Sequence, residues 1–366
     1  MTITHRSQST TSTQRDAWVE INLSALERNF KKLKDLLKTD IMAIVKADAY
    51  GHGATIICPI VQSLGVSSFG VATVDEGIAL RNAGIKTPIV ILGATPFWTL
   101  ESCLKNSLTI TIYSTEQLNQ IEDFAKKTNS KLPVQIKIDT GMNRLGINFQ
   151  EAKETIERVT SSANLKPEGI FSHLSDAKDY NFSKLQKERF ELAVEFCCDK
   201  TLQKHIANSY AAINYPDFRY NLTRIGIALF GQEFNFLEPI ISLKSRITQI
   251  HKVESGEYIS YERTWKAESE SLIATIPIGY ADGIDRRLSN KITAKCNDKK
   301  IRQVGTITMD QMMFDITNTP NSKIGDIITL IDNELLISSW ANELNTLTYE
   351  LTCRLKMRLP RIYTRD

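Results

Sequence analysis

The chain has 366 residues, of which 42% are hydrophobic and 24% are charged, and its 45 basic residues nearly balance its 42 acidic ones. This composition indicates a folded globular protein with more than one domain, and the small net charge gives no reason to expect a nucleic-acid or membrane partner. The six cysteines include no CxxC pair, and no apolar run approaches the ~20 residues that span a bilayer. We therefore expect a cytoplasmic protein without a metal site.

The N-terminal part of the chain predicts a tail, a strand and a helix. Residues 1–15 are rich in Ser and Thr and lack an apolar stretch, so we expect a disordered tail there. Residues 17–22 alternate like a strand, which we expect to join the C-terminal domain. The sequence Ser-Ala-Leu-Glu, beginning at Ser24, predicts a capping box at the start of a helix. That helix carries apolar residues at helical spacing, namely Leu26, Phe30, Leu33 and Leu37.

From residue 41 onward, short apolar runs alternate with helical stretches. The predicted strands cover residues 41–46, 69–73, 88–92, 108–112, 133–138, 168–172, 203–206 and 218–224, and the helices between them include 75–82, 115–127, 151–160 and 184–198. Eight such repeats indicate an α/β fold, a (β/α)8 TIM-like barrel that fills residues 16–238. An open doubly wound sheet is the alternative, but no GxGxxG turn follows the first strand.

After residue 238 the pattern changes. Residues 239–366 are rich in Ile, Val and Thr and show few helical periods, apart from a helical piece near residues 338–344. Because these residue types favour strands, we predict a mostly β C-terminal domain.

Polar residues follow five of the eight predicted barrel strands. Barrel enzymes place their chemistry at the C-terminal ends of the strands, so these side chains should converge. A lysine that ends a buried strand is costly, and burial would lower its pKa and favour Schiff-base chemistry. Each residue alone also has an ordinary explanation as a solvated charge or a packed side chain. The set comprises Lys46, Tyr50, Lys137, Arg144, His173, Asn208, Ser209, Arg224, Gly226 and Ile227.

Several segments resemble the alanine racemase family in the expected order. AIVKADAYGHG at residues 43–53 resembles the family's lysine motif for pyridoxal 5'-phosphate (PLP), and RIGIALFG at residues 224–231 resembles its phosphate-binding segment. Further matches are ISYERTW, IPIGYADG, VGTITMDQMMFDI and TLTYELTCRLKMRLPR. The resemblance extends over residues 16–363. It implies a PLP-dependent racemase that interconverts L- and D-alanine, a homodimer with shared active sites, and a supply of D-alanine for peptidoglycan.

The resemblance also assigns roles to single residues. It implies Lys46 and the partner subunit's Tyr261 as the two catalytic bases, one for each face of Cα. It implies cofactor contacts from Lys46, Tyr50, His173, Asn208, Ser209, Arg224, Gly226, Ile227 and Tyr349. It implies substrate contacts from Arg144, Tyr280, Met309 and Asp310. Lys137 resembles a lysine that is carbamylated in some members of the family.

Four positions depart from the family pattern. Ile225 replaces a proline and Phe230 a tyrosine, and neither removes a hydrogen-bonding group on which the assignment depends. Asp48 replaces an asparagine and adds a negative charge two residues from Lys46, which would raise the pKa of the lysine's aldimine if the side chain points inward. Asn143 replaces a glycine, and we expect it to adopt left-handed backbone angles, which asparagine tolerates.

Three alternatives stay open at this stage. A serine racemase or a racemase of broader specificity would share the same motifs. A PLP-dependent amino-acid decarboxylase is less consistent with Arg224, because that class has an acidic residue beside the pyridine nitrogen. A non-catalytic PLP carrier would lack residues 240–366. The sequence leaves open the substrate breadth, the modification of Lys137, the stability of the dimer, and a biosynthetic or catabolic role.

Overall fold

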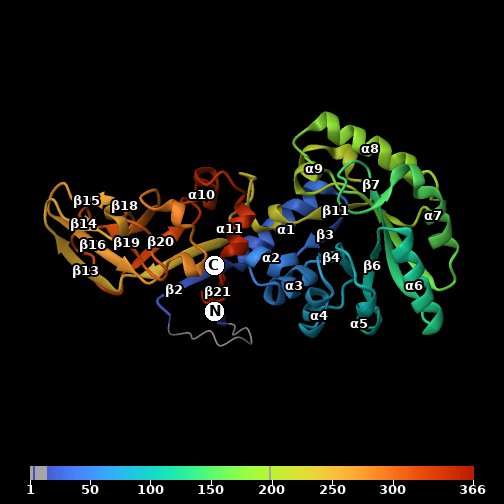
Figure 1. Ribbon diagram of the computed structural model, residues 1–366, viewed down its shortest axis with the longest axis horizontal. Coiled ribbons are helices and arrows are strands. Elements are labelled where there is room, and N and C mark those ends of the chain that lie inside the picture. Colours follow the sequence, from blue (N-terminus) through green and yellow to red (C-terminus); the bar gives the residue numbers. More distant parts are fainter. Residues whose placement is uncertain (1–2, 5–14, 198) are drawn as a thin grey trace. The chain divides into compact units, whose positions relative to one another are not determined.

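The computed structural model describes every residue except 1–2, 5–14 and 198. Most of the predicted tail therefore lies outside the described residues. The chain divides into two compact units (Figure 1). The barrel unit contains residues 29–49 and 54–229, and the β unit contains residues 1–28, 50–53 and 230–366. Each unit is described below by itself.

The barrel unit is built on a parallel sheet whose strands follow the order β10-β9-β7-β6-β5-β4-β3-β11 (Figure 1). The strands are β3 (Asp40–Ile44), β4 (Ser68–Val71), β5 (Ile89–Ile91), β6 (Leu108–Ile112), β7 (Leu132–Asp139), β9 (Leu165–Phe171), β10 (Gln203–His205) and β11 (Leu222–Ile225). All eight predicted strands are confirmed. A short strand, β8 (Ile147–Asn148), pairs only with β7.

The sheet nearly closes on itself. The first barrel strand, β3, pairs in parallel with both β4 and the last strand, β11, so the open-sheet alternative is wrong. Strands β10 and β11 lie at the ends of the strand order and are not joined by a ladder, and the side chain of Asn221 bridges them instead. Its Oδ1 accepts from Lys204 N at 2.6 Å, and its Nδ2 donates to Leu202 O at 3.1 Å. Most buried side chains of the barrel strands are apolar, although polar and charged residues such as Gln135, Lys137 and Arg224 are buried among them.

Helices follow most of the barrel strands. They are α3 (Ala54–Ser63), α4 (Val74–Asn82), α5 (Leu100–Lys105), α6 (Thr115–Lys127), α7 (Ala152–Ser161), α8 (Tyr180–Val194) and α9 (Ser209–Asn214). The prediction for α6 matches residue for residue. Helix α8 begins four residues earlier than predicted, because the Asp179 side chain accepts from Phe182 N and caps it.

The predicted capping box at Ser24 is wrong. Helix α1 (Leu23–Leu37) already includes Ser24, and the residue that caps it is Asn22. Asn22 Oδ1 accepts at 2.9 Å from the backbone N of Ala25, which follows it by three residues. The four apolar residues predicted for this helix are all buried.

The β unit contains a ten-stranded sheet in the order β1-β21-β2-β12-β20-β17-β18-β19-β16-β13, and a separate pair, β14-β15. Only β2 and β21 run parallel. The strands are β1 (Ile3–Thr4), β2 (Ala17–Asn22), β12 (Ile241–Arg246), β13 (Gln249–Val253), β14 (Tyr258–Ile259), β15 (Trp265–Lys266), β16 (Ser271–Ile276), β17 (Thr293–Cys296), β18 (Lys299–Val304), β19 (Met312–Asp315), β20 (Ile327–Ile331) and β21 (Arg361–Thr364). The strand predicted at residues 17–22 is thus confirmed, and it pairs with β12 and β21.

Two helices belong to the β unit, α10 (Ile337–Glu343) and α11 (Thr348–Arg354). The first was predicted and the second was not. Among the described residues, no helix is both long and apolar enough to cross a membrane. Within the same part of the chain, no three His, Cys, Asp or Glu side chains gather in a way that could hold a metal ion.

The two candidate caps of α1 can be separated by mutation. We expect Asn22→Ala to lower the free energy of unfolding by about 1 kcal/mol, because it leaves an N–H group of the first turn without its acceptor. Ser24→Ala should cost clearly less, because the Ser24 hydroxyl donates to the exposed Asp366 O and not to the helix. Urea titration of both variants measures the difference. Equal losses would contradict the assignment of Asn22 as the cap.

Candidate functional site

Lys46 begins an unusual turn. Helix α2 (Lys46–Gly51) is left-handed, since φ is +52° at Ala47, +53° at Asp48, +54° at Ala49 and +55° at Tyr50. For residues other than glycine this conformation costs roughly 1–2 kcal/mol each. Lys46 itself is exposed just after the first barrel strand, so our expectation that it is buried is wrong.

The departure at Asp48 has a structural explanation. Asp48 Oδ1 accepts from Ala54 N, the first residue of α3, at 2.7 Å. A carboxylate at the positive end of a helix is stabilised there. Asp48 therefore ties the end of the left-handed turn to the helix that follows it.

Arg224 lies at the end of the last barrel strand, and only 3% of its surface is exposed. Its Nη1 donates to His205 Nδ1 at 2.7 Å and to His205 O at 3.1 Å. Its Nη2 donates to Ser172 O, Ile206 O and His173 Nδ1, at 2.8, 2.9 and 2.9 Å. Burial lowers the pKa of Arg224 to about 9, which leaves the side chain cationic at neutral pH. No described carboxylate lies within salt-bridge distance of it.

The two histidines beside Arg224 are neutral. Both Nδ1 atoms face its N–H groups and therefore act as acceptors, which places the ring proton of each histidine on Nε2. His205 Nε2 then donates to Gln135 Oε1 at 2.9 Å. Burial, followed by the charge of Arg224, holds the pKa of both imidazoles well below the usual range. The charges of Lys137, Arg144 and Lys46 also lower the pKa of His173, so these predicted residues lie around it.

Phe171 supports the buried cations. Lys137 Nζ lies 5.7 Å and the Arg224 guanidinium 5.6 Å from the centre of its ring. The His205 ring is parallel to the ring of Phe171 at 4.8 Å. Cation–π attraction offsets part of the cost of removing these charges from water.

Lys137 is the lysine whose ionisation is perturbed. Burial, followed by the charges of Arg144 and Arg224, lowers its pKa to about 8. Roughly one amine in ten is then neutral at pH 7. We expected burial to lower the pKa of a lysine at position 46; burial has this effect on Lys137.

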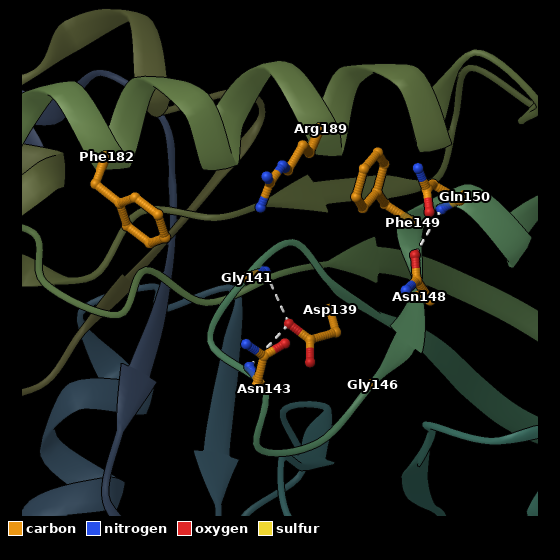
Figure 2. A pocket seen from close by; sticks show the side chains of 9 residues that line it. All are labelled: Asp139, Gly141, Asn143, Gly146, Asn148, Phe149, Gln150, Phe182 and Arg189. Atoms are coloured by element: carbon orange, nitrogen blue, oxygen red, sulfur yellow. Dashed lines mark hydrogen bonds between the residues drawn. The ribbon is translucent and has the colours of Figure 1, made fainter.

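Arg144 lies on a rigid loop. Asp139 Oδ1 accepts from Gly141 N at 2.9 Å and from Asn143 N at 3.1 Å (Figure 2). Asn143 has a φ of +55°, so the left-handed conformation we expected is confirmed. Arg189 of α8 donates to Thr140 O at 3.0 Å. Together with Asp139 and Asn143 it lines a cavity of about 380 Å³.

Hydrogen-bonding groups gather where the last two barrel strands end. Asn208 caps α9 by accepting from Ala211 N at 3.1 Å. The Ser209 hydroxyl accepts from Gly226 N at 3.1 Å. Ile227 begins a short 3-10 helix, whose first N–H groups have no partner within that helix. The N–H groups at the start of a helix in this position of a barrel suit a phosphate group.

Within the β unit, two predicted cofactor contacts lie together. The rings of Tyr50 and Tyr349 meet edge to face at 6.1 Å. Phe230 packs against Tyr50 at 5.4 Å and is stacked on His52 at 4.5 Å, which explains why an aromatic residue without a hydroxyl is tolerated there. Burial raises the pKa of both tyrosines, so each keeps its proton and remains a hydrogen-bond donor. Gly51 has a φ of +82° and no room for a Cβ, which would lie 2.3 Å from Thr352 O.

The other predicted residues of the β unit lie on its surface. Tyr261 is 70%, Met309 53% and Tyr280 42% exposed. Tyr280 N donates to Thr308 O and Ala281 N donates to Met309 O, so the loops of Tyr280 and Met309 lie side by side. The Asp310 carboxylate instead pairs with Arg358 at 2.6 Å.

We did not predict Gln135, Phe171 or His205 as residues of the site from the sequence. His205 lies in the strand predicted at residues 203–206, yet only the folded structure shows that its ring reaches Arg224. The fold is that of barrel enzymes, and the cation cluster lies at the strand ends where such enzymes place their chemistry.

Comparisons with known proteins agree with this class. The family model of the alanine racemase N-terminal domain matches residues 21–233, and that of the C-terminal domain matches residues 240–363. The chain therefore belongs to the alanine racemase family, whose members are amino-acid racemases. The alanine racemase of Nostoc sp. is 39% identical over 94% of this chain and 95% of its own.

Two solved structures are similar to this chain over nearly its whole length. The alanine racemase of Clostridium difficile 630 has a TM-score of 0.91 and 34% identity, with 97% of each chain covered. The alanine racemase of Bacillus anthracis with bound L-Ala-P has a TM-score of 0.88 and 31% identity, with 97% of this chain and 96% of that chain covered.

The neutral histidines predict a pH-dependent stability. Their pKa values are lower in the folded protein than the ordinary value of about 6.5, so below that pH the unfolded chain binds more protons. The free energy of unfolding should therefore fall as the pH drops from about 6.5, by up to about 1.4 kcal/mol per pH unit for each histidine. Urea titrations between pH 7.5 and 5.5 measure this slope. His205→Gln should reduce it; an unchanged slope in that variant would contradict the assignment.

Proposed function

We propose that this protein interconverts L- and D-alanine with PLP bound at the mouth of the barrel. The observation that carries the proposal is the buried Arg224 with its hydrogen bond to His173, set among the cations Lys46, Lys137 and Arg144. The positive charge of this cluster favours a ligand with negative charges. A cofactor phosphate and a substrate carboxylate supply them.

The residues present fit PLP. The N–H of Ile227 and the hydroxyl of Ser209 are suited to hold its phosphate, together with Gly226 and the cap at Asn208. Tyr50 and Tyr349 are further proposed phosphate ligands, and both keep the proton that such a bond needs. Lys46 is exposed and can hold the cofactor covalently.

Arg224 sets the character of the proposed chemistry. Bound PLP supplies an electron sink for the electron pair left behind when the Cα proton departs. Both Nη atoms of Arg224 are already bonded within the barrel, which leaves its Nε–H for the pyridine nitrogen. Because a guanidinium does not give up its proton, it keeps that nitrogen unprotonated. This weakens the sink, which suits removal and return of one proton.

Two bases handle the proton. In our proposal Lys46 removes or returns it on one face of Cα, and Tyr261 of the partner subunit acts on the other. The exposure of Tyr261, Tyr280 and Met309 supports a subunit interface of a homodimer at this surface. His173, held by Arg224, would contact the partner's Tyr261 and favour its phenolate.

Arg144 is proposed to bind the substrate carboxylate, with Tyr280, Met309 and Asp310 lining the pocket. We further propose that Lys137 is carbamylated: its neutral amine adds to carbon dioxide, and one proton is released. The low pKa of Lys137 supports this step. The carbamate carries a negative charge and would pair with Arg144, which otherwise faces another cation.

The roles of the two domains, the location and the biological role are proposals as well. We propose that residues 16–238 bind the cofactor and that residues 239–366 complete the partner's site. A cytoplasmic location and a role in supplying D-alanine for peptidoglycan rest on the family alone. A racemase for serine or for several amino acids remains the alternative in substrate breadth.

Incubation with L-alanine in deuterated water tests the reaction. We expect D-alanine that carries deuterium at Cα, with no pyruvate or carbon dioxide, seen by NMR and chiral chromatography. Lys46→Ala should lose the visible absorbance of bound PLP and slow racemisation by more than about a hundredfold. Serine, lysine and arginine are run in parallel. Release of carbon dioxide, or deuteration without D-alanine, would contradict the proposal.

Tyr261→Phe separates the two bases. Racemisation should fall by about 10²–10⁴. One enantiomer should still exchange its Cα proton with solvent, because Lys46 acts on that face. Mixing Lys46→Ala with Tyr261→Phe subunits should restore part of the activity through hybrid dimers. If verified hybrids stay inactive, the two bases do not come from different subunits.

A further inference from the structure

The Glu76 carboxylate joins two loops at the mouth of the barrel. Glu76 belongs to the first turn of α4, which follows the second barrel strand. Its Oε1 accepts from Ala47 N at 2.7 Å. Its Oε2 accepts from Ala72 N at 2.7 Å and from Thr73 N at 3.3 Å. One side chain thus connects the residue that follows Lys46 to the end of the neighbouring strand.

The turn after Lys46 needs such a support. Ala47 is the first of four residues other than glycine with φ between +52° and +55°, and such a turn is not stable by itself. Within the turn, Ala49 N donates to Val45 O at 2.8 Å. The N–H group of Ala47 points instead at a side chain 29 residues away. Glu76 therefore fixes the turn where it leaves Lys46.

A carboxylate is the group that this position requires. It must accept hydrogen bonds on both oxygens at the same time, from Ala47 on one and from Ala72 on the other. A glutamine could serve only one of them, because its amide has a single oxygen. The negative charge also strengthens both bonds.

We propose that Glu76 is a positioning residue for Lys46. It does not contact the substrate. It holds the Ala47 amide, and through it the backbone from which the Lys46 side chain extends, so that Nζ reaches one face of Cα. The inference rests on the proposed function, in which Lys46 is one of the two bases. It assigns to Glu76 a role beyond capping its own helix.

Thr73 provides a matched control. The Thr73 hydroxyl accepts from Glu76 N and completes the capping box of α4, whereas the Ala47 N–H donates to Glu76 and not to Thr73. Thr73→Ala therefore weakens the same helix end without releasing the turn. If Glu76 only caps α4, the two positions should give the same phenotype.

The kinetic test compares Glu76→Gln with Thr73→Ala in the holoenzyme. We expect Glu76→Gln to lower kcat for alanine by about ten- to a hundredfold, because a small displacement of a base has effects of this size. KM should change less than about threefold, since no substrate contact is lost. Thr73→Ala should stay within about twofold of the parent protein. Glu76→Asp, which keeps both oxygens on a shorter chain, should lie between them.

The step that belongs to Lys46 can be isolated. In a Tyr261→Phe background, exchange of the Cα proton of one enantiomer with deuterated water reports on Lys46 alone. Adding Glu76→Gln should slow that exchange by the same factor as kcat, and adding Thr73→Ala should not. Equal exchange rates in the two double variants would overturn the proposal.

Amide exchange gives a readout that needs no turnover. Mass spectrometry of a peptide covering residues 46–53 should show faster exchange in Glu76→Gln than in the parent, and parent-like exchange in Thr73→Ala. This arm remains decisive if the protein fails to racemise alanine, so the two failures are distinguishable. Parent-like exchange in Glu76→Gln would show that Glu76 does not hold the turn.

Discussion

The constraint on which the site depends is a buried cation without an acid beside it. Desolvating a guanidinium is costly, and Arg224 recovers that cost through three carbonyl oxygens and two imidazole nitrogens. The arrangement works only while both histidines are neutral. Gln135 secures this for His205, since its amide oxygen takes the one remaining ring proton. The barrel therefore holds a charge that it does not neutralise.

That charge spreads its effect through the mouth of the barrel. Burial is the larger cause of the lowered pKa values of His173 and His205, and the charge of Arg224 lowers them further. The same charge contributes to the lowered pKa of Lys137. Phe171 gives partial relief to Lys137 and Arg224 through the face of its ring. A site with this much positive charge favours ligands that bring phosphate or carboxylate groups.

The sequence predicted the repeating elements well because their signal is local. The spacing of apolar residues indicates buried strands and amphipathic helices, and it predicted all eight barrel strands and α6. The cap of α1 was misplaced by two residues, because Ser24 and Asn22 are both good caps and only the backbone decides between them. His205 and Phe171 were missed for another reason. Their roles depend on register between strands, which no local pattern contains.

Both proposed bases occupy backbone that local preference opposes. Lys46 precedes four left-handed residues other than glycine, and Tyr261 lies between Ser260, with a φ of +66°, and Glu262, with a φ of +62°. Each turn is held from a distance: Ala47 N by Glu76, and Tyr261 O by the Thr306 hydroxyl at 2.9 Å. Strain of this kind persists only where surrounding contacts over-determine it. A base on such a turn has few alternative positions, and a proton acceptor that must meet one face of one carbon gains from that restriction.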